Sequence, residues 1–193
     1  MVTGSAKLNI FQKGGDSLMG RYLLYRMHPF SVNELLRRTP DDRIMTTPKK
    51  ISAEKWNFLK RSLVKEPKIY LWDWSDIADP GAKLENLVAA HLHKAVHFWT
   101  DTGLGDFGLF YLRDKEKNEV DFLVTRDNAP WFLVEVKSSD KNALSKNLLY
   151  FQQQIKAPHA FQIALNKPFV DVDCFTTHTP VIVPLLTFLS QLV

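Results

Sequence analysis

The chain has 193 residues, a hydrophobic fraction of 45% and a formal net charge of +4, which suits one ordinary domain or two small ones. Its single cysteine excludes an intrachain disulfide, and no stretch reaches the ~18 continuous apolar residues of a membrane span. The N-terminus lacks the charged and apolar regions of a signal peptide. We therefore expect a cytoplasmic protein with no membrane partner.

The charge balance changes along the chain. Residues 1–79 hold 14 Lys and Arg against 9 Asp and Glu, whereas residues 80–193 hold 11 against 12. A basic part of this kind favours phosphates, although scattered basic residues are usually only a solvated face. The Pro80-Gly81 pair interrupts the chain between the two parts, so we place a domain boundary there.

The first part predicts pieces of an α/β arrangement. Residues 2–5 indicate the end of a buried strand. An apolar strand within 20–36 is followed by a helix, for which Ser31 and Glu34 form a capping box. Residues 52–65 predict a second helix.

The second part predicts a complete α/β domain. Apolar residues with a period near 3.6 indicate a helix over 82–98, and a helix is also expected over the C-terminal run VIVPLLTFLSQLV. The order helix, three strands, helix, strand, helix is typical of a mixed sheet flanked by helices. The remaining elements are strands at 107–112, 119–125, 131–137 and 161–166, and a helix around 142–156.

The second and third of these strands predict a hairpin with apolar faces. Because side chains alternate across a strand, Val120, Phe122 and Val124 are expected on one face. The five residues RDNAP between the strands suit a hairpin loop, and this length places Leu123 opposite Leu133.

The same register brings charged side chains together. Asp121 is set opposite Glu135, and Glu119 is set opposite Lys137. Opposed carboxylates repel each other, and burying them unpaired costs several kcal/mol, so a cation is expected between them. Lys137 supplies one positive charge on the same strand face as Glu135.

A divalent ion would neutralise these carboxylates more fully. Mg²⁺ is typically held by one or two carboxylates and waters, and Mn²⁺ accepts the same ligands. Glu85 borders the apolar face of the helix at 82–98 and is a candidate third ligand. Such a site favours phosphodiester hydrolysis, in which the ion activates water and a lysine stabilises the transition state. The alternative is a structural ion-pair cluster.

Histidine and cysteine chemistry is less well supported. His93 and His97 are four residues apart and can share a helix face, but no cysteine or carboxylate spacing supports a zinc site. No neighbouring histidine pattern predicts that Cys174 is a nucleophile.

The spacing of the charged residues resembles a known nuclease core. Asp121, followed after 13 residues by Glu-Val-Lys at 135–137, is similar to the motif of the PD-(D/E)xK nucleases. The upstream Glu85 is similar to the arrangement in Holliday-junction resolvase-like members, and the glutamines at 152–154 also fit. The resemblance implies that Asp121, Glu135 and Lys137 are catalytic. It also implies a metal on Glu85, Asp121 and Glu135, and DNA as a partner.

A longer resemblance covers nearly the whole chain. The stretches LENLVAAHLHK, YLRDKEKNEVDFLV and FLVEVKSS resemble the domain of unknown function 4143, which is found at the C-terminus of many AAA-type ATPases. Residues 1–50 resemble the end of the ATPase domain, with VTGS similar to its sensor strand. This resemblance implies that Ser5 and Arg21 are positions that sense the γ-phosphate of ATP.

The chain departs from that family in one respect. It has no G-x-x-x-x-G-K-[ST] and no hydrophobic strand ending in paired acids, so ATP hydrolysis by this chain is not expected. We expect an N-terminally truncated member, with a remnant of the ATPase domain at 1–79 and a nuclease-like domain at 80–193. A missing ATPase half would then be a partner, and ATP a cofactor of the intact form. Two functions remain open: metal-dependent cleavage or binding of nucleic acid, and a non-catalytic regulatory module.

Overall fold

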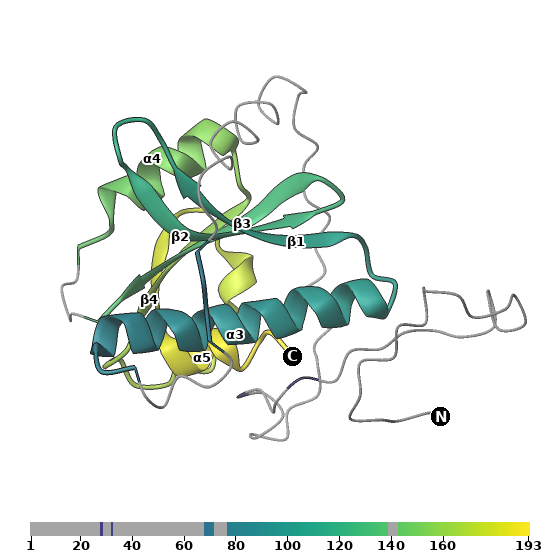
Figure 1. The fold of residues 1–193 in the computed structure, drawn as a ribbon, viewed down its shortest axis with the longest axis horizontal. Helices are drawn as coiled ribbons and strands as arrows, with labels where there is room; N and C mark the ends of the chain where they lie inside the picture. The colour runs from purple at the N-terminus through teal and green to yellow at the C-terminus, as the bar shows by residue number, and fades with distance from the viewer. Residues whose placement is uncertain (1–27, 29–31, 33–67, 72–76, 139–142) are drawn as a thin grey trace, which may run out of the picture.

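A computed structural model describes residues 28, 32, 68–71, 77–138 and 143–193 of the chain (Figure 1). Most of the expected ATPase remnant at 1–79, including Ser5 and Arg21, lies outside these residues. The described part forms a five-stranded sheet with strand order β1-β2-β3-β4-β5. In Figure 1, α3 and α5 lie on one side of this sheet and α4 lies on the other.

The first helix of the domain is α3, Pro80–Asp101, which confirms and extends the helix expected at 82–98. Asp79 is its N-cap and accepts a hydrogen bond from the Ala82 N–H at 2.6 Å. Pro80 occupies the first turn, where no intrahelical donor is needed. The apolar stripe of α3 is buried against the sheet because it repeats every three to four residues.

Three antiparallel strands follow, which are β1 (Phe107–Arg113), β2 (Glu119–Arg126) and β3 (Ala129–Lys137). The strand β4 (His159–Ala164) is parallel to β3, so the expected mixed sheet is confirmed. Leu123 pairs with Leu133 as the sequence predicts.

The turn of the β2–β3 hairpin is shorter than expected. The strands continue to Arg126 and from Ala129, so only Asp127 and Asn128 form the turn, and the predicted five-residue loop is wrong. Both residues have positive φ, 51° and 62°. Positive φ at both central positions is the pattern of a type I′ turn, which suits the twist of a hairpin and which Asp and Asn tolerate better than most residues.

The C-terminal run is divided between two elements. The residues expected to start a helix form β5, Val181–Pro184, which is parallel to β4, and the helix α5 covers only Leu185–Leu189. The β-branched residues of Val-Ile-Val suit a strand, and Pro184 then occupies the N-cap of α5.

Two apolar clusters hold the layers together. The larger one joins α3 and α5 to one face of the sheet and includes Trp99, Trp131 and Phe132. The smaller one joins α4 (Lys146–Ile155) to the opposite face. Among the described residues, no helix is long and apolar enough to cross a membrane.

Candidate functional site

The strand β2 contains a bulge at its charged end. In the pairing with β1, Phe110 lies opposite Leu123 but Leu112 lies opposite Val120, so β2 carries one extra residue between the two pairs. The expectation that Val120 and Phe122 share a face is therefore wrong. Val120 packs in the smaller cluster with α4, and Phe122 packs in the larger cluster with α3. Bulges re-aim side chains and are frequent beside active sites.

Asp121 lies in this bulge, and its side chain bonds to the neighbouring strand. Its Oδ2 accepts a hydrogen bond from the Val136 N–H at 2.8 Å. At the open end of the hairpin, the regular pairing of β2 with β3 ends at Phe122 and Val134, next to Asp121. The carboxylate of Asp121 therefore bonds to the β3 backbone where the regular ladder has stopped.

The surroundings of Asp121 make its ionised form costly. Burial is the main cause that raises the pKa of Asp121 to about 6, and the charges of Glu85 and Glu135 raise it further. The hydrogen bond from Val136 and the charge of Lys68 act in the opposite direction. A carboxyl group with this pKa gains and loses a proton near neutral pH, which is a common property of groups in active sites.

Lys68, which sequence reasoning missed, is a cation among Glu85, Glu119 and Asp121 rather than between Asp121 and Glu135, where the sequence predicted one. Its Nζ lies 3.1 Å from Glu85 Oε1, 2.5 Å from Glu119 Oε1 and 3.6 Å from Asp121 Oδ1. Burial lowers the pKa of Lys68, but the hydrogen bond to Glu119 and the charges of Glu85 and Asp121 outweigh burial and raise it. Lys68 is therefore a charged ammonium at neutral pH.

Glu135 is the most deeply buried acid of the group. Its side chain is only 5% exposed, and its Oε1 lies 2.6 Å from the Nζ of Lys137. Its Oε2 is buried and, within the part of the chain that the structure describes, has no hydrogen-bond partner. We call Glu85, Glu119, Asp121 and Glu135 together the carboxylate cluster. The regular β2–β3 pairing ends at Phe122 and Val134, so it does not include the expected pair of Glu119 and Lys137. The ammonium of Lys137 contacts Glu135 on its own strand.

The start of α4 is fixed beside Glu135. Ser145 is the N-cap of α4, and its Oγ lies 3.4 Å from Glu135 Oε1. Gln162 of β4 pairs with Glu135 in the parallel ladder and holds this loop through two hydrogen bonds. Its Oε1 accepts from the Ser145 N–H at 2.7 Å, and its Nε2 donates to the Ala143 carbonyl at 3.1 Å. The neutral side chains of Ser145 and Gln162 therefore fix the start of α4 next to the buried Glu135.

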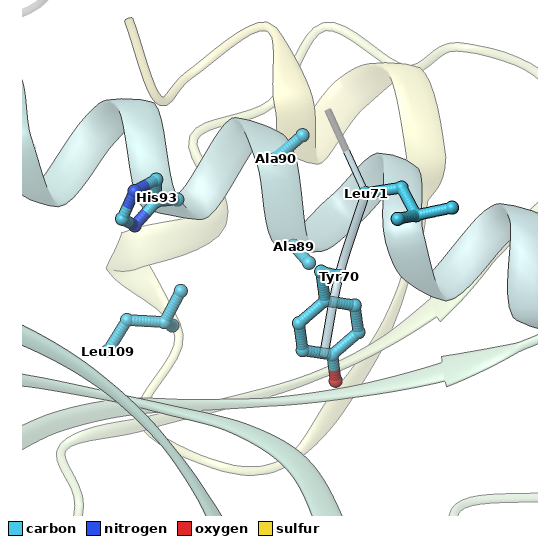
Figure 2. Close-up of a pocket in the computed structure, with 6 residues that line it drawn as sticks. All are labelled: Tyr70, Leu71, Ala89, Ala90, His93 and Leu109. Carbon is cyan, nitrogen blue, oxygen red and sulfur yellow. The ribbon is translucent and has the colours of Figure 1, made fainter. Parts of the chain in front are cut away.

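Tyr70 closes the other side of the cluster. Its hydroxyl donates to Glu85 Oε1 at 2.7 Å, and burial together with this bond raises the pKa of Tyr70. Figure 2 shows its ring between α3 and the sheet, beside a pocket that is also lined by His93 and Leu109. That lining includes none of the four carboxylates, so the pocket is a separate feature from the cluster.

The donor chemistry of the cluster suits a hard divalent ion. Carboxylate oxygens are the ligands of Mg²⁺ and Mn²⁺, and the unpartnered Oε2 of Glu135 is an oxygen that such an ion would satisfy. As the side chains are placed, however, no group of three or more His, Cys, Asp or Glu among the described residues is arranged to hold a metal ion. Lys68 contacts three of the four carboxylates instead.

Comparison with known protein families gives a match to the second part of the chain. The family described as "Domain of unknown function (DUF4143)" matches residues 80–179, slightly more than half of the chain. The chain belongs to the DUF4143 family. No curated protein and no solved structure matches it. The DUF4143 match contains all four members of the carboxylate cluster and Lys137, whereas Lys68 and Tyr70 precede it.

The other candidate residues from the sequence analysis lie in the DUF4143 domain but outside the carboxylate cluster. Gln152 donates to the carbonyls of Ala157 and His178, so it holds the end of α4. The rings of His93 and His97 do share a face of α3, with centroids 4.0 Å apart. Burial raises the pKa of the Cys174 thiol to about 11, which makes it a poor nucleophile.

Four of the sequence-predicted site residues meet in this DUF4143 domain. Asp121 and Glu135 interact electrostatically, Lys137 contacts Glu135, and Glu85 joins them through its charge on Asp121 and its contact with Lys68. Glu119 shares Lys68 with Glu85, and its place at the start of β2 was visible in the sequence. No sequence signal points to Lys68 or Tyr70, because they lie 17 and 15 residues before the helix residue that they contact.

Proposed function

We propose that the DUF4143 domain of this chain, over residues 80–193, is PD-(D/E)xK-like and acts in metal-dependent cleavage or binding of nucleic acid. The observation that carries the proposal is the buried Oε2 of Glu135. It has no partner among the described residues, and it belongs to a carboxylate that raises the pKa of Asp121. A buried acid whose pKa is raised by a neighbouring carboxylate is typical of a site built for a cation.

The positions of the elements support the same proposal. Asp121 lies in a bulge of β2, Glu135 and Lys137 lie at the end of β3, and the N-cap of α4 lies beside Glu135. A site at strand ends, beside a bulge and a helix N-terminus, concentrates charged side chains without disturbing the apolar layers. The helix α3 adds Glu85 from the opposite side.

Each residue has a distinct task in this proposal. Asp121 and Glu135 would hold Mg²⁺ or Mn²⁺, with Glu85 as an auxiliary ligand. The bound ion would supply an acidified water and neutralise charge on a phosphate. Lys137 is kept protonated because Glu135, Asp121 and Glu85 together outweigh its burial and raise its pKa, so its ammonium can stabilise negative charge that develops on a phosphate.

The proposal also includes the AAA-type context that the first part of the chain resembles. In an intact family member, Ser5 and Arg21 would sense the γ-phosphate of ATP, and an ATPase half would work together with the DUF4143 domain. Such an arrangement would couple nucleotide binding to action on DNA.

A second function is favoured by a different observation. Lys68 already neutralises three of the carboxylates, and residues 80–193 have 11 Lys and Arg against 12 Asp and Glu, which gives little attraction for phosphates. On this basis the cluster would be a structural ion-pair network. The domain would then be a non-catalytic interaction or regulatory module of an ATP-binding protein.

Cleavage assays separate the two functions. Wild type is incubated with single-stranded, duplex and branched DNA in the presence of Mg²⁺ or Mn²⁺, beside Asp121→Ala, Glu135→Ala and Lys137→Ala. We expect cutting that requires the metal and that each substitution abolishes. The matched controls are Lys115→Ala and Glu116→Ala, which remove exposed charges of the same kinds in the turn between β1 and β2. A folded wild type that cuts nothing and binds no Mn²⁺ would support the regulatory module, and variants that cut as well as wild type would place the cutting outside the carboxylate cluster.

A further inference from the structure

We propose that Lys68 is a built-in cation that takes the place of a metal ion in the carboxylate cluster, so that a divalent ion binds only after the Lys68 side chain leaves. This inference rests on the proposed metal site. It adds an autoinhibitory residue that precedes the DUF4143 match and that no motif identifies.

The geometry around the Lys68 ammonium resembles that of a bound cation. One nitrogen is shared by Glu85 of α3 and by Glu119 and Asp121 of β2, at 3.1, 2.5 and 3.6 Å. An exposed ion pair usually joins two groups and contributes little to stability. Here three acids from two elements converge on one side chain, which is only 25% exposed.

Lys68 and a divalent ion would compete for the same oxygens. The Lys68 side chain is an ammonium that forms ion pairs with Glu85, Glu119 and Asp121. Both competitors therefore neutralise Glu85, Glu119 and Asp121, and only one of them can lie between these groups. A divalent ion could also be bound by Glu135, whose Oε2 has no partner within the described ranges and which is paired with Lys137 rather than Lys68.

The side chain can leave without the backbone moving. The side-chain amide of Asn86 in α3 makes two hydrogen bonds to the backbone of Leu71. Its Oδ1 accepts from the Leu71 N–H at 2.7 Å, and its Nδ2 donates to the Leu71 carbonyl at 2.5 Å. The Tyr70 hydroxyl is fixed on Glu85. The segment is thus anchored two and three residues after Lys68, whose four-carbon stem can rotate toward solvent. The neighbouring Ile69 is 87% exposed, so this edge of the segment faces outward.

The first test measures Mn²⁺ binding to the full chain by isothermal titration calorimetry. Lys68→Met removes the charge and keeps most of the stem, and Lys115→Met is the matched control at an exposed position. We expect roughly tenfold tighter Mn²⁺ binding by Lys68→Met than by wild type, because the competing cation is gone. Lys115→Met should bind like wild type, and adding Asp121→Asn to Lys68→Met should abolish binding.

The outcomes distinguish this inference from the function on which it rests. Equal Mn²⁺ affinity of wild type and Lys68→Met, with binding lost in Asp121→Asn, would overturn the role of Lys68 and leave the metal site intact. No binding by a folded Lys68→Met, as judged by circular dichroism, would overturn both the metal site and the inference.

A second measurement needs no substitution and covers the case in which Lys68→Met does not fold. Wild type is treated with an amine acylating reagent, and modification of Lys68 is compared with that of Lys115 by mass spectrometry. We expect Mn²⁺ to increase the modification of Lys68 several-fold and to leave Lys115 unchanged, because displacement exposes the ammonium. Modification of Lys68 that stays the same whether or not Mn²⁺ is present would overturn the inference.

Discussion

The two ends of the β2–β3 hairpin are built on opposite principles. At the turn end, Trp131 is completely buried among aromatic rings, and the chain reverses in two residues. At the open end, the regular β2–β3 pairing stops at Phe122 and Val134, beside the bulge that β2 forms against β1, and charged groups gather around Lys68. The same two strands therefore carry buried aromatic packing at one end and costly electrostatics at the other. The residues expected to stabilise the fold and the candidate site residues thus lie at opposite ends of the same two strands.

The aromatic end should be the most sensitive to truncation. Trp131 packs against Trp99, Phe107, Phe132 and Phe175, with ring centroids 5.0 to 5.7 Å apart. We expect Trp131→Ala to lower the free energy of unfolding by about 3–5 kcal/mol, because it removes a large side chain and leaves a cavity. Urea unfolding followed by circular dichroism measures this loss.

An exposed apolar residue provides the control for that prediction. Leu186 is 49% exposed, so Leu186→Ala should cost less than about 1 kcal/mol. Losses of similar size for the two variants would mean that the aromatic end is not the stabilising end of the hairpin.

The charged end should behave in the opposite way, since its acid is a cost to the folded state. The pKa of Asp121 is raised from its ordinary value of 3.8 to about 6. Above pH 6 the group is ionised in both states and the full cost is present, whereas below about pH 4 both states are protonated and the cost is gone. Asp121→Asn should therefore raise the free energy of unfolding at pH 7 by about 2–3 kcal/mol.

The pH dependence makes this second prediction specific. The difference between Asp121→Asn and wild type should shrink as the pH falls from 7 to 4, in unfolding curves recorded across that range. A constant difference, or a variant less stable than wild type at pH 7, would contradict the view that the open end is electrostatically strained. Asn retains an oxygen that can accept the Val136 N–H, so the backbone contact is not the variable.

The turn itself should show the smallest effect. Asn128 has φ of 62°, a conformation that costs other residues with a Cβ about 1 kcal/mol. Asn128→Ala should lose about that much stability, while Asn128→Gly should stay close to wild type, because glycine adopts this conformation freely. Thermal unfolding of the two variants compares them directly, and identical midpoints would argue against the type I′ turn.

The sequence predicts those parts of the fold that depend on local pattern. The period of the apolar residues locates α3, and β-branched and aromatic runs locate β1 to β4. The spacing of Asp121 and Glu135 brings two cluster members together, because hairpin register is a local property. The turn at Asp127 and Asn128 also depends on local sequence. It was missed because the predicted strands ended too early, at 125, and began too late, at 131.

The remainder depends on contacts that no local pattern contains. Lys68 joins the cluster only because the segment before α3 packs along that helix, an arrangement fixed by Asn86 and Tyr70. The bulge in β2 is set by two apolar clusters that need Val120 and Phe122 on opposite faces. The strand β5 forms because β4 offers it a parallel neighbour, which an apolar run ending in Pro184 does not reveal.

The bulge in β2 has an evolutionary consequence. Val120 already faces α4, whereas Phe122 faces α3, so removing the single codon for Asp121 would leave a strand whose side chains alternate regularly between the two layers. Both apolar layers would survive such a deletion, and the carboxylate at the centre of the cluster would be gone. A lineage could therefore lose the central carboxylate of the cluster in one step while inheriting the architecture of the domain unchanged.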